Sequence, residues 1–264
     1  MSKDHQLEIK NMRAGYGDKV IIDNMSVVIP DHKISVFIGP NGCGKSTLLK
    51  IFARLIDPIK GERKLDGRDY STYGAKELAQ LIGLLPQSPI VPEGIKVSDL
   101  VARGRFPYQQ PFRSIKKEDF AIVDEAMEMM RISELADKNV EELSGGQRQR
   151  VWIAMALAQQ TDILFLDEPT TYLDIRYQIE ILDLLKELNE KRKITIVMVL
   201  HDINLSARYA DCLFALANKN LICYGKPKEI LNQELMKEVF GLDCCIIEDP
   251  LYATPMVVPK GSHY

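Results

Sequence analysis

The chain has 264 residues, of which 46% are hydrophobic and 27% are charged, so it can form one large domain or a core with an inserted subdomain. Its 34 basic and 37 acidic residues give a formal net charge of -3, which gives no electrostatic reason to expect a nucleic-acid partner. The five cysteines are odd in number and lack CxxC spacing, which indicates a reducing compartment without a structural zinc.

Apolar stretches in this sequence are short. The run at 151–158 is among the longest and falls far below the ~20 residues that cross a bilayer. A charged segment followed by an apolar one, typical of a secretory leader, does not open the chain. We therefore expect no membrane span, and any role at a membrane would depend on a partner.

Two short strands are predicted near the start, at Leu7 to Arg13 and at Val20 to Ile29, around a turn at 15–18. Tyr16 would lie in this loop. An exposed ring there can stack on a nucleotide base, but taken alone the motif fits a tyrosine that packs the hairpin better. The strands alone leave both interpretations open.

A phosphate-binding loop follows the apolar strand Ile34 to Ile38 and precedes a helical segment that begins near Lys45. Its glycines permit positive φ, its amides can surround phosphate oxygens, and the helix N-terminus adds a partial positive charge. Lys45 can reach the β- and γ-phosphates, and the Ser46 hydroxyl can bind Mg²⁺. The loop consists of Gly39, Pro40, Asn41, Gly42, Cys43, Gly44, Lys45, Ser46 and Thr47.

Cys43 lies among these amides and close to Lys45 in the sequence. Such a setting can lower the pKa of a thiol, so alkylation would block ATP binding. An inert small residue is the alternative interpretation.

The segment after this loop predicts a hairpin at 64–69, a buried strand at 81–85 and then Gln87 in a proline-flanked loop. Helices are predicted at 97–105, 117–130 and 146–158. The aromatic and basic stretch between the first two helices, residues 104–108, is a candidate docking surface.

A second anion-binding helix end is predicted at Leu143-Ser144-Gly145-Gly146-Gln147. Its serine and paired glycines expose a hydroxyl and backbone amides at the start of an apolar helix. One chain already has a loop for its phosphates. We therefore expect this second end to serve the nucleotide of another subunit.

Two acids close the apolar strand at 163–166. Asp167 can hold Mg²⁺ through water, and Glu168 can orient or deprotonate the attacking water. A helical stripe through 174–189 and a buried parallel strand at 194–200 follow. His201 comes directly after that strand, at the edge of the sheet where doubly wound folds bind ligands. A hairpin at 211–224, two short helices and irregular segments complete the chain.

The order of these motifs resembles the nucleotide-binding subunit of an ABC transporter over roughly residues 7–225. Three further strings, at 84–87, 101–107 and 170–175, are similar to the ATPases of bacterial iron-siderophore, haem and cobalamin importers. Tyr172 departs from the small apolar residue that is common at its position in the family's D-loop.

The resemblance assigns roles to individual residues. Tyr16 would stack on adenine, Gln87 would sense Mg²⁺ and the membrane subunit, and Glu168 would be the catalytic carboxylate. His201 would contact the γ-phosphate. The residues that it places on ATP across a head-to-tail dimer are Ser144, Gly145, Gly146, Gln147 and Asp174.

The fold that the resemblance implies is α/β, a RecA-like P-loop NTPase core with an antiparallel β part and an inserted α-helical subdomain. We expect one ABC ATPase domain over 1–264. Its core would comprise 1–88 and 161–264, and its helical signature subdomain would comprise 89–160.

The function that the resemblance implies is Mg²⁺-dependent ATP hydrolysis by a homodimer at the cytoplasmic face of the cell membrane. The dimer would drive an integral membrane permease that receives ferric siderophore from an extracytoplasmic substrate-binding protein. A helix of the permease would dock near Gln87 and residues 103–108. Haem or cobalamin import is the alternative, and a soluble ABC ATPase outside transport is a more distant one.

Overall fold

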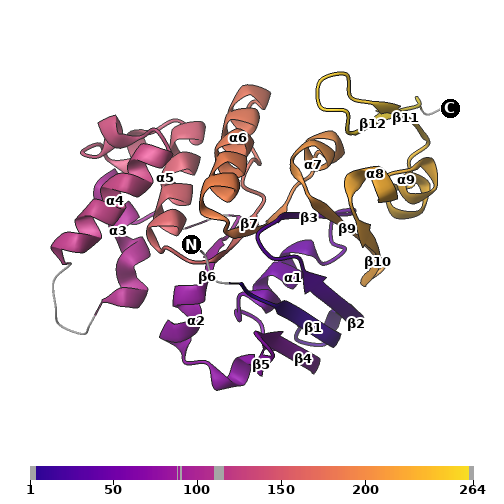
Figure 1. The fold of residues 1–264 in the computed structure, drawn as a ribbon, viewed down its shortest axis with the longest axis horizontal. Helices are drawn as coiled ribbons and strands as arrows, with labels where there is room; N and C mark the ends of the chain where they lie inside the picture. Colours follow the sequence, from indigo (N-terminus) through magenta and orange to yellow (C-terminus); the bar gives the residue numbers. More distant parts are fainter. Residues whose placement is uncertain (1–3, 88, 90, 110–115, 262–264) are drawn as a thin grey trace. The chain divides into compact units, whose positions relative to one another are not determined.

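The computed structural model describes residues 4–87, 89, 91–109 and 116–261. The chain forms two compact units (Figure 1). The helical unit comprises Tyr73–Ile194, and the P-loop unit comprises Lys3–Thr72 with Thr195–Tyr264. The expected division at residues 88/89 and 160/161 stays a prediction, and Ser88 on that boundary lies outside the described residues, as do residues 110–115 of the expected helical subdomain.

One sheet of the P-loop unit is antiparallel, in the order β2-β1-β4-β5. Its long strands pair in register from Leu7 opposite Ile29 to Tyr16 opposite Lys19, with β-bulges between. Apolar side chains of both strands point to one buried face, which is why the segment folds as a half-buried sheet. The strands are β1 (Leu7–Tyr16), β2 (Lys19–Ile29), β4 (Lys60–Leu65) and β5 (Arg68–Asp69).

The other main strands of the P-loop unit surround β3 (Ile34–Ile38), which pairs in parallel with β8 (Thr195–Val199) and β9 (Cys212–Ala217). All residues of these three strands are buried, as expected for parallel strands covered on both faces. The edge strand β10 (Asn220–Gly225) is antiparallel to β9, which confirms the predicted hairpin.

Helices of the P-loop unit follow these strands. The structure confirms the two short helices expected near the C-terminus. The segments after them were expected to be irregular, and for residues 244–259 this is wrong. These residues form the hairpin of β11 (Cys244–Glu248) and β12 (Pro255–Pro259). The helices are α1 (Lys45–Phe52), the 3₁₀ turn η1 (Tyr70–Thr72), α7 (Ile203–Tyr209), α8 (Pro227–Ile230) and α9 (Gln233–Phe240).

Tertiary contacts with α7 hold this C-terminal hairpin. Asn204 bonds both backbone groups of Val257, at 2.8 and 3.2 Å, and Arg208 pairs with Asp249 at 2.7 Å. The Arg208 guanidinium also lies 4.2 Å from the ring centre of Tyr252. Since the two strands are short and β12 has proline at both ends, their local sequence predicts no sheet.

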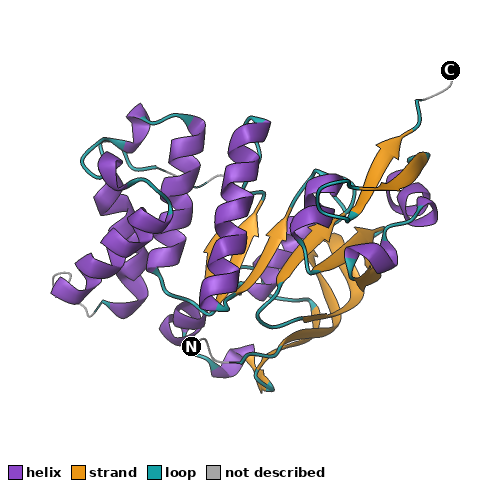
Figure 2. Cartoon of the chain, turned by 45° about the horizontal axis from the view of Figure 1, so that its top comes forward, coloured by secondary structure: helices purple, strands orange, loops and turns teal. Residues whose placement is uncertain are grey.

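The helical unit contains the parallel strand pair β6 (Ile82–Leu85) and β7 (Ile163–Asp167) and a block of helices (Figure 2). The helices α3, α4 and α5 pack on one another around a core of apolar side chains. The helices are α2 (Ala75–Leu81), α3 (Val97–Ala102), α4 (Lys117–Met129), α5 (Gly145–Ala158) and α6 (Ile175–Arg192), with the 3₁₀ turns η2 (Arg103–Tyr108), η3 (Ser133–Leu135) and η4 (Val140–Glu142).

Arg105, in the stretch expected to form a docking surface, is buried. Its guanidinium donates to Asp119 and to the carbonyl oxygen of Ala158, each at 2.8 Å, and lies 4.0 Å from the ring centre of Tyr108. Arg105 therefore ties η2 to α4 and α5, and the docking surface expected at residues 104–108 stays a prediction. Phe106, 69% exposed, remains available at the surface.

No helix in the described parts of the chain is both long and apolar enough to cross a membrane.

Candidate nucleotide site

The loop between β3 and α1 has the backbone conformation that its glycines predict. Gly39, Gly42 and Gly44 have φ of 148°, 77° and 112°. A Cβ atom on Gly39 would lie 2.2 Å from the carbonyl oxygen of Leu216, so no side chain fits there. Gly44 caps α1 in the left-handed conformation, which directs the first helical amides toward the loop.

Lys45, the first residue of α1, turns its ammonium group back onto this loop. Its Nζ donates to the carbonyl oxygens of Gly39 at 2.7 Å and Pro40 at 2.9 Å, and the side chain is buried. Asn41 and Gly42, at the tip of the loop, are exposed. The charge of Lys45 is thus held where the loop can close around an anion.

Cys43 is buried beneath the same loop, with its Sγ 3.9 Å from the Lys45 ammonium. Burial raises the pKa of this thiol, and the opposing effect of the Lys45 charge is smaller. The expectation of a lowered thiol pKa is therefore wrong, because desolvation disfavours the thiolate more than one ammonium group stabilises it. The expected block of ATP binding by alkylation stays a prediction.

His201 lies at the same edge of the P-loop unit as the glycine loop. The parallel strands β3 and β8 pair with Phe37 opposite Val199, so Gly39 and His201 both follow the carboxyl ends of neighbouring strands. Asp202 caps α7 by accepting from the Leu205 amide at 2.8 Å, which begins the helix directly after His201. His201 is exposed at this edge, where open α/β sheets bind ligands.

Tyr16 lies at the end of β1, opposite Lys19 in the hairpin. Half of the residue is exposed, so the ring does not pack fully against the hairpin. This exposure favours the base-stacking interpretation, since a ring must be accessible to cover a nucleobase.

In the helical unit, Gln87 and Glu168 follow the carboxyl ends of the parallel strands β6 and β7, which pair with Leu85 opposite Leu166. Gln87 Nε2 donates to Glu168 Oε2 at 2.6 Å, and Thr171 Oγ1 donates to the same oxygen at 2.9 Å. Glu168 has a positive φ of 55°, a rare conformation for glutamate that is often retained at functional sites. Asp167, one residue earlier, is buried at the strand end.

Thr171 is a site residue that the chemical argument from the sequence missed. It stands three residues after Glu168, the spacing at which a turn returns a side chain to the acid. The backbone amide of Thr171 also donates to the Glu168 carbonyl oxygen at 3.3 Å, which closes this turn.

Ser144 caps α5 through a reciprocal capping box. The Gln147 amide donates to Ser144 Oγ at 3.3 Å, and the Ser144 amide donates to Gln147 Oε1 at 3.1 Å. Ser144 and Gly145 are exposed, whereas Gly146 is buried against α6. A Cβ on Gly146 would lie 3.1 Å from the ring of Tyr177. The N-terminus of α5 is thus held against α6 at Gly146, while Ser144 and Gly145 remain exposed.

The loop before α6 is also open. Asp174 is exposed at the N-cap of α6, and Tyr172 is 95% exposed with a φ of 64°. Ile175, the first residue of α6, is 58% exposed. The first turn of α6 therefore presents apolar surface, which is typical of an interface.

Comparison with known proteins places this arrangement in a family. The sequence profile of the family described as "ABC transporter" matches residues 22–171. The Bacillus subtilis "Probable siderophore transport system ATP-binding protein YusV" is 50% identical over 97% of this chain and 93% of its own length. The Escherichia coli ferric enterobactin transport ATP-binding protein FepC is 49% identical over 97% of this chain and 94% of its own.

A solved structure gives the same result for the fold. The dimeric structure of MJ0796, a bacterial ABC transporter cassette, superimposes with a TM-score of 0.73 at 29% identity, over 83% of this chain and 98% of that one. The chain therefore belongs to the ABC transporter family, as one of its ATP-binding subunits.

Proposed function

We propose that this protein hydrolyses ATP to power the import of ferric siderophore through a separate membrane permease. The cargo assignment rests on sequence similarity. About half of the residues, over nearly the whole chain, are identical to those of two subunits whose names specify siderophore and ferric enterobactin transport. The arrangement of Gln87, Thr171 and Glu168 supports the catalytic part of the proposal.

The P-loop unit supplies phosphate binding. The amides of residues 39–47 surround the phosphates, and Lys45 exchanges its carbonyl partners for β- and γ-phosphate oxygens. His201 donates to the γ-phosphate, and Tyr16 covers the adenine ring. These roles use the exposed positions of Tyr16 and His201.

The helical unit supplies the group that activates water. Glu168 orients and deprotonates the attacking water, and hydrogen bonds from Gln87 and Thr171 hold its Oε2 in place. Gln87, which bonds this carboxylate, links the site to the permease. Release of its hydrogen bond on docking would couple the permease to catalysis.

Magnesium fits the donor set of this chain. Mg²⁺ prefers hard oxygen ligands, bound directly or through water. The P-loop unit offers the hydroxyl of Ser46, and the helical unit offers the amide oxygen of Gln87 and the buried carboxylate of Asp167. When bound, Mg²⁺ neutralises charge on the β- and γ-phosphates.

The functional unit is a homodimer in which the exposed helix end of one subunit completes the site of the other. Ser144, Gly145, Gly146 and Gln147 would bind the γ-phosphate across the interface, with Asp174 and the exposed Tyr172 beside it. ATP binding favours the closed dimer, and hydrolysis removes that preference.

The remaining partners are an integral membrane permease and, through it, an extracytoplasmic substrate-binding protein. The protein would lie peripherally at the cytoplasmic face of the cell membrane. Exposed Phe106 and its neighbours on η2 offer the contact surface for a helix of the permease.

Affinity capture tests this assignment. Tagged Glu168→Gln protein is incubated with ATP and detergent-solubilised membranes of its host, and bound proteins are identified by mass spectrometry. We expect a polytopic permease, with reduced recovery for the matched Lys45→Ala variant, in which ATP binding should be weakened. Recovery of ribosomal or DNA-bound partners alone, with the protein absent from membranes, would favour the soluble alternative.

Cargo is tested by uptake in a host strain that lacks this subunit. We expect loss of ferric siderophore uptake and recovery when the wild-type gene is returned, but not when Glu168→Gln is returned. Intact siderophore uptake together with lost haem or cobalamin uptake would overturn the cargo assignment while leaving the ATPase assignment standing.

A further inference from the structure

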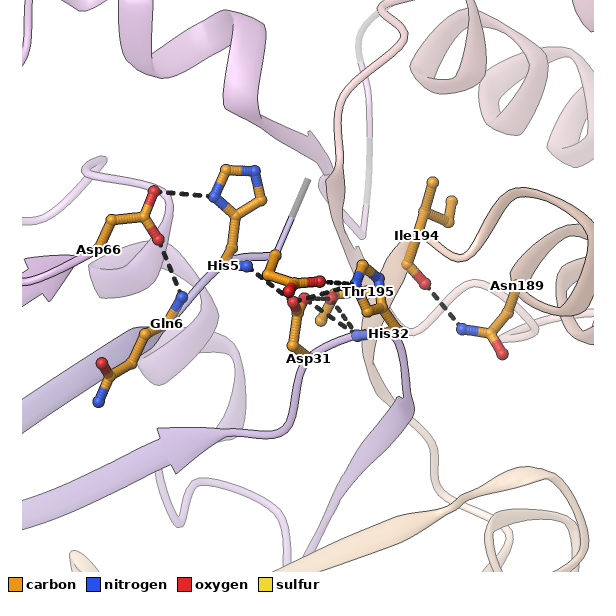
Figure 3. Close-up of polar contacts among 9 residues, drawn as sticks. His5, Gln6, Asp31, His32, Asp66, Asn189, Ile194 and Thr195 are labelled. Carbon is orange, nitrogen blue, oxygen red and sulfur yellow. Dashed lines mark hydrogen bonds and ion pairs between the residues drawn. The ribbon is translucent and has the colours of Figure 1, made fainter. Parts of the chain in front are cut away.

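Three potential metal ligands meet where β2 leads into β3, within the P-loop unit and outside the glycine loop. His32 Nε2 lies 2.8 Å from Asp4 Oδ1 and 3.2 Å from Asp31 Oδ2. One donor atom from each of the three side chains falls within a span of 4.8 Å. Figure 3 shows the Asp31 and His32 side chains side by side in this cluster.

Two of these residues, Asp31 and His32, lie in one turn, and hydrogen bonds to Thr195 hold that turn in place. The Thr195 hydroxyl donates to Asp31 Oδ1 at 2.6 Å and accepts from the His32 amide at 2.8 Å (Figure 3). The His32 amide also approaches Asp31 Oδ1 at 3.0 Å, and the His5 amide donates to Asp31 Oδ2 at 2.7 Å. The neighbouring side chains thus fix the ligands before any ion binds, as the outer partners of metal ligands do.

The three ligands differ in how firmly they are held. Hydrogen bonds from the Thr195 hydroxyl and the His5 amide hold the Asp31 carboxylate, which is partly buried. Asp4 is almost fully exposed and can adjust its position. The cluster therefore combines a fixed carboxylate, a fixed imidazole and a mobile carboxylate.

We propose that Asp4, Asp31 and His32 form a Zn²⁺ site. One imidazole nitrogen and two carboxylate oxygens, with water as a fourth ligand, suit zinc, whereas Mg²⁺ and Ca²⁺ prefer oxygen ligands alone. Zinc would bind the unprotonated Nε2 of His32, and any proton on that nitrogen would leave to solvent. The ligand set contains no cysteine, so cysteine spacing gives no sign of it.

Bound zinc would join two segments of the P-loop unit directly and a third through the hydrogen bonds of Thr195. Asp4 precedes β1, Asp31 and His32 connect β2 to β3, and Thr195 begins β8. The β3 and β8 strands lead to Gly39 and His201, respectively. The ion would thus act as a clamp at the opposite end of the strands from the nucleotide loop, and its binding does not depend on nucleotide.

Isothermal titration with ZnCl₂ tests the site in full-length, untagged, nucleotide-free protein that has been freed of metal by a chelator. Because thiolates also bind zinc, every protein carries Cys245→Ser, which removes the exposed thiol. We expect one Zn²⁺ per chain and an affinity at least about tenfold weaker in Asp4→Asn and in His32→Asn. Asp4→Asn removes an exposed carboxylate and leaves the fold intact.

Asp66→Asn is the matched control. Asp66 accepts from the ring of His5, the residue after Asp4, at 2.9 Å and lies outside the ligand set, so zinc affinity should be unchanged. Zinc should also raise the unfolding temperature of the parent protein but not that of His32→Asn. Absence of one-site binding in the parent, or equal affinity in the parent and in both ligand variants, would overturn the site and leave the cluster a network of ion pairs.

Discussion

Gln87 donates a 2.6 Å hydrogen bond from its side-chain amide to Glu168 Oε2, although 81 positions separate the two residues. The contact forms because β6 and β7 run parallel and end together, so the residue that follows each strand reaches the other. The hydrogen bond thus holds the Glu168 carboxylate against the segment that follows β6.

Glu168→Gln should abolish steady-state ATP hydrolysis while ATP binding is retained. The amide keeps the size of the side chain but cannot accept a proton from water, a loss of roughly 100-fold or more. Phosphate release measures hydrolysis, and nucleotide titration measures affinity. The variant should also accumulate as a closed dimer with ATP in size-exclusion chromatography, and near-normal turnover would remove Glu168 from its catalytic role.

Thr171→Val should lower the turnover rate without changing ATP affinity. Valine keeps the shape of threonine but removes the hydroxyl that donates to Glu168 Oε2 at 2.9 Å, so the carboxylate loses a hydrogen bond that holds it in place. We expect a decrease of about tenfold, the effect of one hydrogen bond of about 1.5 kcal/mol. Thr171→Ser restores the donor and should recover most of the rate; equal loss in both variants would argue for packing instead.

Gly39→Ala should destabilise the protein far more than Gly42→Ala. Both residues have positive φ, but a Cβ on Gly39 would lie 2.2 Å from the Leu216 carbonyl oxygen, whereas a Cβ on Gly42 would meet no atom within 4 Å. Gly42→Ala should cost only the backbone strain of about 1 to 2 kcal/mol. Urea unfolding without nucleotide measures both, and equal effects would show that Leu216 does not restrict the loop.

How far the sequence predicts this site depends on how local each feature is. The pattern of apolar runs locates the ends of the buried strands. At or directly after such ends lie the glycine loop, Asp167, Glu168 and His201. Gln87 follows the same logic, but its bond to Glu168 depends on the pairing of β6 with β7, which no local pattern specifies.

Features that depend on burial in the tertiary structure could not be predicted from the sequence. The position of Cys43 beside Lys45 is local, whereas the desolvation that raises its thiol pKa comes from the packed fold. Arg105 belongs to an aromatic and basic stretch, yet it is buried because the Ala158 carbonyl, 53 positions away, accepts one of its hydrogen bonds. The C-terminal hairpin likewise depends on Asn204 of α7.

Cys212 should make stability depend on pH above neutrality. Burial raises the pKa of this thiol from 9.0 to about 11. Between these values the unfolded chain loses the proton first, so the free energy of unfolding falls as pH rises, by at most about 1.4 kcal/mol per pH unit. Urea unfolding on both sides of pH 9.0 should therefore show a shallower decline in Cys212→Ala than in the parent. Identical slopes would contradict the burial effect.

Asp119→Ala should strongly destabilise the helical unit. The change leaves the buried Arg105 guanidinium without its 2.8 Å carboxylate partner, and breaking a buried pair in this way costs about 3 to 5 kcal/mol. The control is Asp243→Ala, which breaks an ion pair with Lys237 at 3.4 Å in which both side chains are more than 70% exposed. Such exposed pairs contribute at most about 1 kcal/mol. Replacing both residues of the buried pair, as Arg105→Met with Asp119→Ala, should recover part of the loss because no buried charge remains. Urea unfolding of the four proteins, including the parent, measures the difference, and similar effects of the two single variants would show that solvent reaches Arg105.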